Sequence, residues 1–302
     1  MSKLILQENV TLKRPILIVA FAGWTDGGRS ATIAAQHLID SWSAQKIGEI
    51  DVDDFFDFTT VRPWVNLGEN GERRLTWPSF KLYAHQDGGS NLDALVLLGP
   101  EPALHWRAFA NEVVDLARAF DVSMVITLGA HLARVSHRDA VPVSGWAWPK
   151  DLNDRLDAVS VERITYEGPT GILTVLADAL ADARIPVASL WAALPGFLGP
   201  TPNPKGALAL AQRLDQAFGL DLPLTDLSKA SADFEQQIDQ AIKRSHAMPG
   251  VALLHSEDSD QPTSESAPPT TEDESKSTAV ELPTAEEIVR DVEQFLRQER
   301  RS

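Results

Sequence analysis

Cysteine is absent from the sequence of 302 residues, which also contains only three methionines and two tyrosines. Without cysteine there is no disulfide bond, no thiolate metal ligand and no cysteine nucleophile, and this composition is typical of a reducing compartment. The first eleven residues do not join a basic region to a long apolar stretch, and no stretch has the roughly 20 apolar residues that a membrane-spanning helix needs. We therefore expect a cytoplasmic protein that neither crosses nor binds a membrane.

Basic residues are also scarce, because 27 lysines and arginines face 43 aspartates and glutamates and give a net charge of −16. A protein that binds nucleic acid usually needs a basic face to displace counterions, so we expect no nucleic-acid partner. Half of the charge lies in residues 256–302, where thirteen acidic residues outnumber five basic ones. The rest of the chain is mildly acidic, and an apolar content of 43% predicts a sizeable core.

The chain opens with a pattern of strand, turn and helix. Residues 16–22 are an unbroken apolar run, residues 23–28 are a glycine turn, and residues 30–42 carry apolar side chains at helical spacing. A strand that is apolar on both faces and leads into a helix is typical of the parallel sheet of an α/β domain. Ligands of such sheets bind outside the carboxyl ends of the strands, so the turn is the first candidate for function.

The same pattern repeats along the chain. Further apolar runs end in turns rich in glycine and proline, and helices follow most of them; the runs cover residues 92–98, 122–128 and 186–194, and the helices residues 103–120, 172–183 and 205–218. Strands that alternate with helices predict an α/β fold, a largely parallel sheet with helices on both faces. The pair Asn70-Gly71 predicts an antiparallel hairpin between residues 64–67 and 73–83. Residues 51–58 are interpreted as a solvated strand edge.

Four segments are expected in the domain organisation: an αβα domain over residues 1–223, an amphipathic helix packed on it within 224–255, an acidic disordered linker over 256–280, and a second amphipathic helix within 281–302. The second helix must bury its apolar stripe. Docking on its own body or on a neighbouring subunit is the favoured interpretation, and docking on a different protein is the alternative.

Residues 23–30, GWTDGGRS, have the spacing of a phosphate-binding loop, but Arg29 stands where that loop has lysine. Arginine does not reproduce the compact charge of lysine, and the bulky Trp24 and acidic Asp26 do not suit a loop that wraps an anion. None of the later apolar runs ends in the aspartate that would hold magnesium. Nucleotide binding is therefore kept only as a minor alternative.

Other catalytic patterns are weak. No GxSxG motif is present. His131 and His137 could ligate a metal together with Asp26, but two histidines on a loop are more often ordinary hydrogen-bonding residues. Glu101 and Glu167 could act as acids, although a helix N-terminus also attracts a carboxylate for structural reasons. We expect no metal and no cofactor.

Tryptophans gather near the strand ends and the loops that follow them: Trp24, Trp64, Trp106, Trp146, Trp148 and Trp191. Several of them at one end of a sheet would make a rigid aromatic surface of the kind that is enriched at protein interfaces. A binding or assembly module is therefore favoured over an enzyme.

Six segments carry a resemblance to a known family: FAGWTDGG (21–28), DFFDFTTVRP (54–63), LLGPEPALHWRAF (97–109), YEGPTGI (166–172), LPGFLGPTPNPKG (194–206) and EEIVRDVEQFLRQ (286–298). With these segments in this order, the chain resembles the proteasome assembly chaperone 2 family, in particular its long actinobacterial-type members. The resemblance implies a three-layer αβα domain with a parallel or mixed sheet, related in fold to nucleoside phosphorylases and similar hydrolases but usually without their catalytic residues.

The resemblance also implies homo-oligomerisation and, for eukaryotic and archaeal relatives, chaperone-like binding during assembly of proteasome core particles. Three departures bear on function. The loop at 136–139 lacks the Pro-His-Thr-Arg run of the family, and residues 195–198 replace its usual Pro-His-Tyr. The sequence ends in Arg300-Arg301-Ser302 instead of the hydrophobic-Tyr-any tail by which some relatives dock on proteasome rings, which argues against docking of that kind.

The favoured hypothesis is a non-enzymatic, homo-oligomeric binding protein, and the alternative is a hydrolase-like or phosphorylase-like enzyme that acts on a small molecule at the strand ends. Both place function in one pocket or interface, for which the candidate residues are Trp24, Asp26, Gly27, Arg62, Glu101, Trp106, His131, His137, Glu167, Thr170, Pro195 and Asn203.

Overall fold

The computed structural model describes residues 4–8, 10–68, 70–86 and 92–247. The chain divides into two compact units, residues 1–252 and 253–302, and all described residues belong to the first. The acidic linker and the second amphipathic helix that the sequence predicts lie outside the described residues.

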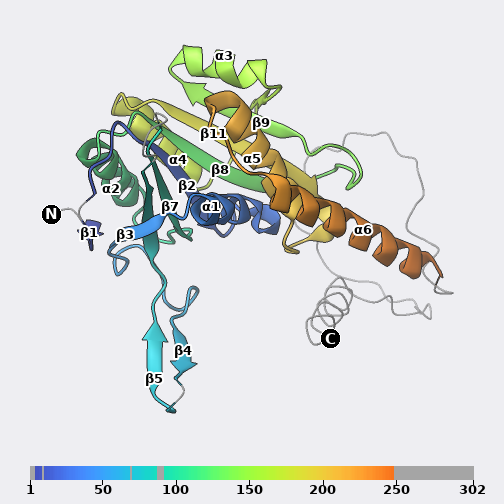
Figure 1. Ribbon diagram of the computed structural model, residues 1–302, viewed down its shortest axis with the longest axis horizontal. Helices are drawn as coiled ribbons and strands as arrows, with labels where there is room; N and C mark the ends of the chain where they lie inside the picture. Colours follow the sequence, from blue (N-terminus) through green and yellow to red (C-terminus); the bar gives the residue numbers. More distant parts are fainter. Residues whose placement is uncertain (1–3, 9, 69, 87–91, 248–302) are drawn as a thin grey trace, which may run out of the picture. The chain divides into compact units, whose positions relative to one another are not determined.

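A nine-stranded sheet forms the centre of the first unit, in the order β1-β3-β6-β7-β2-β8-β11-β9-β10 (Figure 1). Strand β2 lies in the middle and runs parallel to both of its neighbours, β7 and β8, and β11 runs parallel to β8. Antiparallel pairing appears toward both edges, at β1, β6 and β9. The strands are β1 (Leu4–Leu6), β2 (Ile16–Ala22), β3 (Gln45–Ile50), β6 (Phe80–His85), β7 (Ala94–Pro100), β8 (Met124–Ala133), β9 (Val143–Trp148), β10 (Glu162–Arg163) and β11 (Val187–Pro195).

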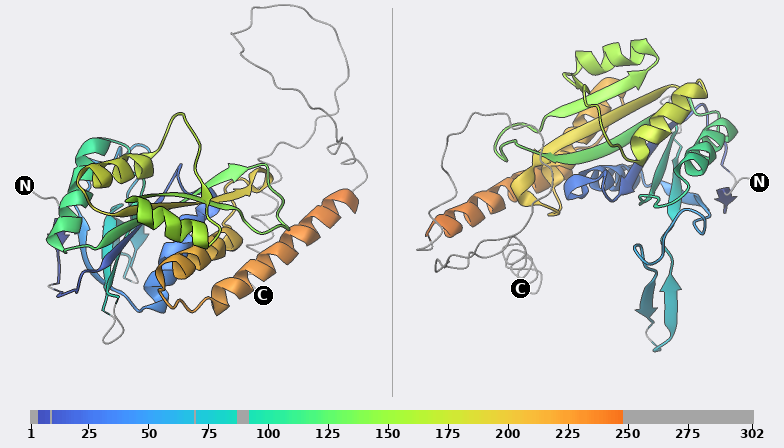
Figure 2. Two further views of the ribbon diagram at one scale, coloured as in Figure 1. Left: turned by 90° about the horizontal axis from the view of Figure 1, so that it is seen from above. Right: turned by 180° about the vertical axis from the view of Figure 1, so that it is seen from behind.

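Helices cover both faces of the sheet (Figure 2). Helices α1 (Ser30–Ser41), α3 (Lys150–Ala158) and α5 (Pro204–Phe218) share one hydrophobic core, and α2 (Trp106–Ala119) and α4 (Ile172–Asp182) share the other. Side chains of β2 alternate between the cores, with Ile18 in the first and Val19 in the second. This double burial explains why the strand is an unbroken apolar run. The predicted three-layer α/β fold with a parallel and mixed sheet is confirmed.

Helix α6 (Thr225–Ala247) follows this domain and packs on α5. Leu227 and Ile238 of its apolar stripe are buried, and Phe234 and Ile242 are half-buried. The stripe therefore faces the body, because the opposite side of the helix carries exposed polar residues. Among the described residues, no helix is both long enough and apolar enough to cross a membrane.

Two local predictions are wrong. Residues 51–58 are not a solvated strand edge but a turn that places Phe55 and Phe56 in the core, where each is less than 4% exposed. The predicted second arm of the hairpin consists of two separate strands, because β5 (Arg73–Thr76) pairs with β4 (Trp64–Leu67) in a sheet of its own, whereas β6 joins the large sheet. Helix α3 and strand β1 were not predicted.

An aromatic cluster holds the turn of Phe55 against the sheet. The ring centroid of Phe80 lies 5.7 Å from that of Phe21, 6.4 Å from that of Phe55 and 4.5 Å from that of Phe109. These rings come from a central strand, a turn, an antiparallel strand and α2, so the cluster joins segments that are far apart in sequence.

We predict that Phe80→Ala lowers the free energy of unfolding by about 3–5 kcal/mol, because it removes a fully buried ring and leaves a cavity among four others. Denaturant titration followed by circular dichroism measures the change. The control is Phe197→Ala, which truncates an exposed ring and should change stability by less than about 0.5 kcal/mol. Equal effects of the two substitutions would contradict the role of the cluster.

Candidate functional site at the carboxyl end of the sheet

Asp26 lies in the turn after β2, and its buried carboxylate is bound to the first turn of α1. Oδ1 accepts hydrogen bonds from the backbone N–H groups of Ala31 (2.7 Å) and Thr32 (3.3 Å), and Oδ2 accepts one from the Thr32 hydroxyl (2.6 Å). Burial raises the pKa of Asp26, and these hydrogen bonds oppose that shift. The carboxylate occupies the position at which a helix N-terminus would otherwise bind an anion.

The glycines of this turn allow three loops to approach one another. A Cβ atom on Gly27 would lie 3.2 Å from the carbonyl oxygen of Ala130, and one on Gly28 would lie 2.9 Å from Cβ of Asn203. Gly28 also has a φ of 53°, in the left-handed region that favours glycine. The turn therefore packs closely against the end of β8 and the loop before α5, and glycine is needed at these positions because a larger residue would not fit.

Glu101 closes the N-terminus of α4 in a similar way. Its Oε2 accepts a hydrogen bond from the backbone N–H of Trp24 (2.9 Å), and its Oε1 accepts one from the N–H of Ile172 (3.3 Å). The loops that follow β2 and β7 and the loop that precedes α4 are thereby joined by one carboxylate. Gly171, next to Thr170, fits against this junction, because a Cβ atom there would lie 3.2 Å from Oε1 of Glu101.

Asn203 caps α5 and ties it to the glycine turn. Its Oδ1 accepts a hydrogen bond from the N–H of Gly206 (3.0 Å), its backbone N–H donates to the carbonyl of Gly28 (2.7 Å), and its carbonyl accepts from the Ser30 hydroxyl (2.9 Å). The N-termini of α1, α4 and α5 are thus each closed by a side-chain oxygen of the protein itself.

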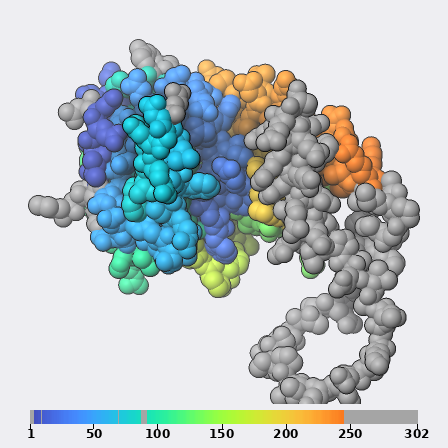
Figure 3. Space-filling model, turned by 90° about the horizontal axis from the view of Figure 1, so that it is seen from below, coloured from blue at the N-terminus to red at the C-terminus, as the bar shows by residue number. Residues whose placement is uncertain are grey.

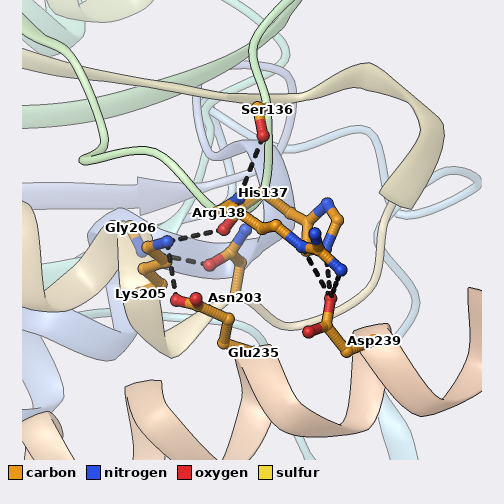
Figure 4. A network of polar contacts seen from close by, with 8 residues as sticks. All are labelled: Ser136, His137, Arg138, Asn203, Lys205, Gly206, Glu235 and Asp239. Carbon is orange, nitrogen blue, oxygen red and sulfur yellow. Dashed lines mark hydrogen bonds and ion pairs between the residues drawn. The ribbon is translucent and has the colours of Figure 1, made fainter.

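His137 belongs to a polar network that fastens α6 to the loop after β8 (Figure 4). Its Nε2 lies 2.8 Å from Oδ1 of Asp239, and the guanidinium of Arg138 contacts the same oxygen at 3.1 Å. Lys205 forms an ion pair with Glu235 at 2.8 Å and donates to the backbone carbonyl of His137. Through these contacts His137 helps to hold the loop after β8, the start of α5 and helix α6 together.

A small cavity of about 10 Å³ brings together three of the predicted site residues, His137, Pro195 and Asn203. This volume is close to that of one water molecule and is too small for a substrate. Phe197 lies beside it, with its ring 5.8 Å from that of His137 in an edge-to-face arrangement.

The remaining predicted residues are spread over the same end of the sheet or lie apart from it. His131 lies at the end of β8 with its ring 6.4 Å from that of Trp191, and partial burial lowers its pKa. The indole of Trp106 is half-buried and donates to the carbonyl of Pro102 (2.6 Å). Three further residues are exposed, namely Arg62 beside β4 and Glu167 and Thr170 in the loop before α4.

Asp26, Glu101 and His137 therefore each have a local partner, and the described residues do not join them into one catalytic group. The described part of the chain also contains no group of three or more histidines and acids that could hold a metal ion.

Exposed apolar side chains surround the capped helix ends. We use the term rim surface for five of them, of which Trp24 is 71%, Tyr166 67% and Phe197 63% exposed, together with Leu104 and Leu132. Trp24 was predicted, but Tyr166 and Phe197 were not singled out, although both lie in loops rich in glycine and proline. Trp106, Trp148 and Trp191 are half-buried, so they contribute less to this surface than their positions in the sequence predict.

A groove of about 540 Å³ opens beside the glycine turn, between α1, the start of α6 and the ends of β2 and β7. Its lining includes Ile33, Leu98 and Leu227, with the acids Asp40 and Asp226. The sequence did not predict the groove, because it arises where α6, packed on α5, begins beside α1.

We predict that Asp26→Ala lowers the free energy of unfolding by about 2 kcal/mol, because it leaves two N–H groups at the start of α1 without acceptors. Asp26→Asn keeps an acceptor oxygen and should cost much less. Urea titration of both variants at pH 7 measures the difference. If both variants lose equal stability, the carboxylate charge rather than the cap is what α1 needs.

The ion pair of Asp239 predicts a pH dependence of α6. Hydrogen bonds from His137 and Arg138 lower the pKa of Asp239 below its ordinary 3.8. A lowered pKa stabilises the folded state above pH 3.8. This stabilisation is lost as the pH falls through the pKa that Asp239 has in the folded protein. Hydrogen exchange should therefore show faster exchange of α6 amides in Asp239→Asn than in the wild type at pH 7. The difference in exchange rate should vanish below the pKa of Asp239 in the folded protein. A difference that persists at lower pH would contradict the pairing of Asp239 with His137 and Arg138.

Comparisons with known proteins give one consistent result. The PAC2 family profile matches residues 20–242. A crystal structure of a PAC2 family protein from Streptomyces avermitilis is 37% identical and covers 75% of this chain and 95% of its own, with a TM-score of 0.71. A proteasome-assembly chaperone homologue from Mycobacterium tuberculosis is 33% identical. It covers 80% of this chain and 97% of its own, with a TM-score of 0.69. An archaeal proteasome activator from Pyrococcus furiosus shares the fold at 19% identity. It covers 80% of this chain and 100% of its own, with a TM-score of 0.64. No curated protein matches the chain.

Proposed function

Because the chain belongs to the PAC2 family, we propose that it is a self-associating, non-enzymatic binding protein of the assembly-chaperone kind that acts in the cytoplasm. The names of its relatives, a proteasome-assembly chaperone homologue and an archaeal proteasome activator, support a chaperone-like role and a protein complex as partner. The rim surface is the part that contacts this partner.

One observation carries the proposal: the ends of α1, α4 and α5 are already closed by Asp26, Glu101 and Asn203, and an exposed aromatic residue, Trp24, stands beside them. In enzymes of related architecture, free helix N-termini at this edge bind anionic substrate groups. Here the protein's own oxygen atoms fill those positions. What is left for a partner is apolar and aromatic, which is the composition of a protein interface.

The alternative is a hydrolase-like or phosphorylase-like enzyme that uses Asp26, Glu101, His131 and His137. The raised pKa of Asp26 and the lowered pKa of His131 are shifts of the kind found in active sites. Burial alone causes the shift of His131 and is the largest cause of that of Asp26, and the Asp26 carboxylate is already bound to α1. We therefore place the alternative second.

Trp24→Ala tests the proposal. We predict that the purified chain binds unassembled subunits of the proteasome core particle of its own organism and that the substitution weakens this binding at least about tenfold, as for a central aromatic residue of an interface. Calorimetry measures the affinity, and analytical ultracentrifugation measures self-association, which should not change.

Trp146→Ala is the matched control, because Trp146 is an exposed tryptophan of β9 that pairs with Ser189, away from the rim surface. Equal losses in both variants would contradict a specific role of the rim. Absence of protein binding, together with thermal stabilisation by a metabolite that is lost in Asp26→Asn, would favour the enzyme.

A further inference from the structure

The hairpin of β4 and β5 stands outside the nine-stranded sheet (Figures 1 and 3). One of its faces is apolar. Val65 pairs with Leu75, and alternation along the strands places Leu67 and Trp77 on the same face. These four side chains are 46–73% exposed. A two-stranded hairpin alone is at best marginally stable in water, and an exposed apolar patch of this kind indicates an interaction site.

The same face carries positive charge. Arg73 pairs with Leu67 and therefore lies on the apolar face. Arg74 lies on the opposite face, where it forms an ion pair with Glu72 at 3.0 Å. A partner of this face needs apolar pockets and an acidic group near them.

The groove between α1 and α6 has these properties. Its volume of about 540 Å³ is enough for several side chains, and Ile33, Leu98 and Leu227 give it an apolar floor. Its charged lining consists of Asp40, Asp226 and Arg29, so carboxylates outnumber guanidinium groups two to one.

We propose that the hairpin of one copy of this chain docks in the groove of a second copy, with Leu67 and Leu75 entering the groove and Arg73 meeting Asp226. This inference rests on the self-association proposed above and names its surfaces. It joins an exposed apolar face that carries Arg73 with an apolar groove that carries Asp226.

The contact forms between copies because the geometry keeps each hairpin away from its own groove. Gly99 lines the groove and lies against the hairpin base, since a Cβ atom on it would be 2.8 Å from the carbonyl oxygen of Ser79. From this base the hairpin points away from the sheet (Figure 1), and Trp77 is held against Phe58 with ring centroids 5.0 Å apart. Each copy then offers one hairpin and one groove, so copies associate either as a two-fold dimer with two reciprocal contacts or head-to-tail as a ring or filament.

Two substitutions separate the partners of this contact. Leu67→Ser with Leu75→Ser removes the apolar face of the hairpin, and Ala230→Arg adds bulk and positive charge to an exposed position that lines the groove. Sedimentation velocity of the full chain should show that each variant raises the concentration for half-maximal association at least about tenfold. An equimolar mixture should form heterodimers and nothing larger, because only one intact hairpin and one intact groove remain per pair.

Matched controls test whether the effects belong to these faces. Trp64→Ser changes the other face of the hairpin, and Ala232→Arg places the same arginine on an exposed position of α6 outside the groove lining. Both should associate as the wild type does, and unchanged thermal melting of all variants shows that they fold.

Each other result overturns the inference. If the hairpin variant associates at the same concentrations as the wild type, the hairpin is not part of the contact between copies. If the hairpin variant is monomeric and the Ala230→Arg variant still assembles, hairpins pair with one another. If both variants are monomeric and do not dimerise when mixed, contact between hairpin and groove is excluded. A wild-type chain that stays monomeric at every concentration contradicts the proposed self-association as well, whereas an assembled wild type with an assembled hairpin variant contradicts this inference alone.

Discussion

The bond between the Asp26 carboxylate and the first turn of α1 is the interaction on which the rest of this end of the molecule depends. It fixes the direction in which α1 leaves the central strand, and the turn that makes it possible needs glycine where it passes Ala130 and Asn203. Because Asn203 in turn caps α5, one turn sets the start of two helices. A buried carboxylate is stable here only because N–H and O–H donors satisfy it.

The sequence predicts the features of this fold that local rules determine. The run at β2 is apolar on both faces because its side chains alternate between two cores, and its observed bounds coincide with the predicted run. Helices α5 and α6 follow from apolar periodicity, and α5 begins at Pro204, one residue before the predicted start. Strand β11 ends at Pro195, one residue past the predicted run, where the proline-rich loop begins.

What the sequence does not predict depends on contacts between distant segments. Phe55 and Phe56 lie among acids in a way that resembles a solvated edge, yet the rings of Phe80 in β6 and Phe109 in α2 pack against them in the core. Asp26 resembles a catalytic or phosphate-excluding acid until the turn is seen to fold back on Ala31. His137 resembles a metal ligand until Asp239, 102 residues later, is brought beside it. Such pairings are tertiary, and no local pattern encodes them.

The same fold can therefore serve either catalysis or binding, and the atoms at the ends of the helices decide between them. A helix N-terminus that stays open invites an anion, whereas one that is closed by a neighbouring side chain becomes part of the scaffold. In this chain the closure of α1, α4 and α5 fixes the backbone of the loops at the sheet end. Fixed loops lose less backbone entropy when a partner binds to them. The capping that removes a site for anions therefore suits the protein-binding surface that we propose.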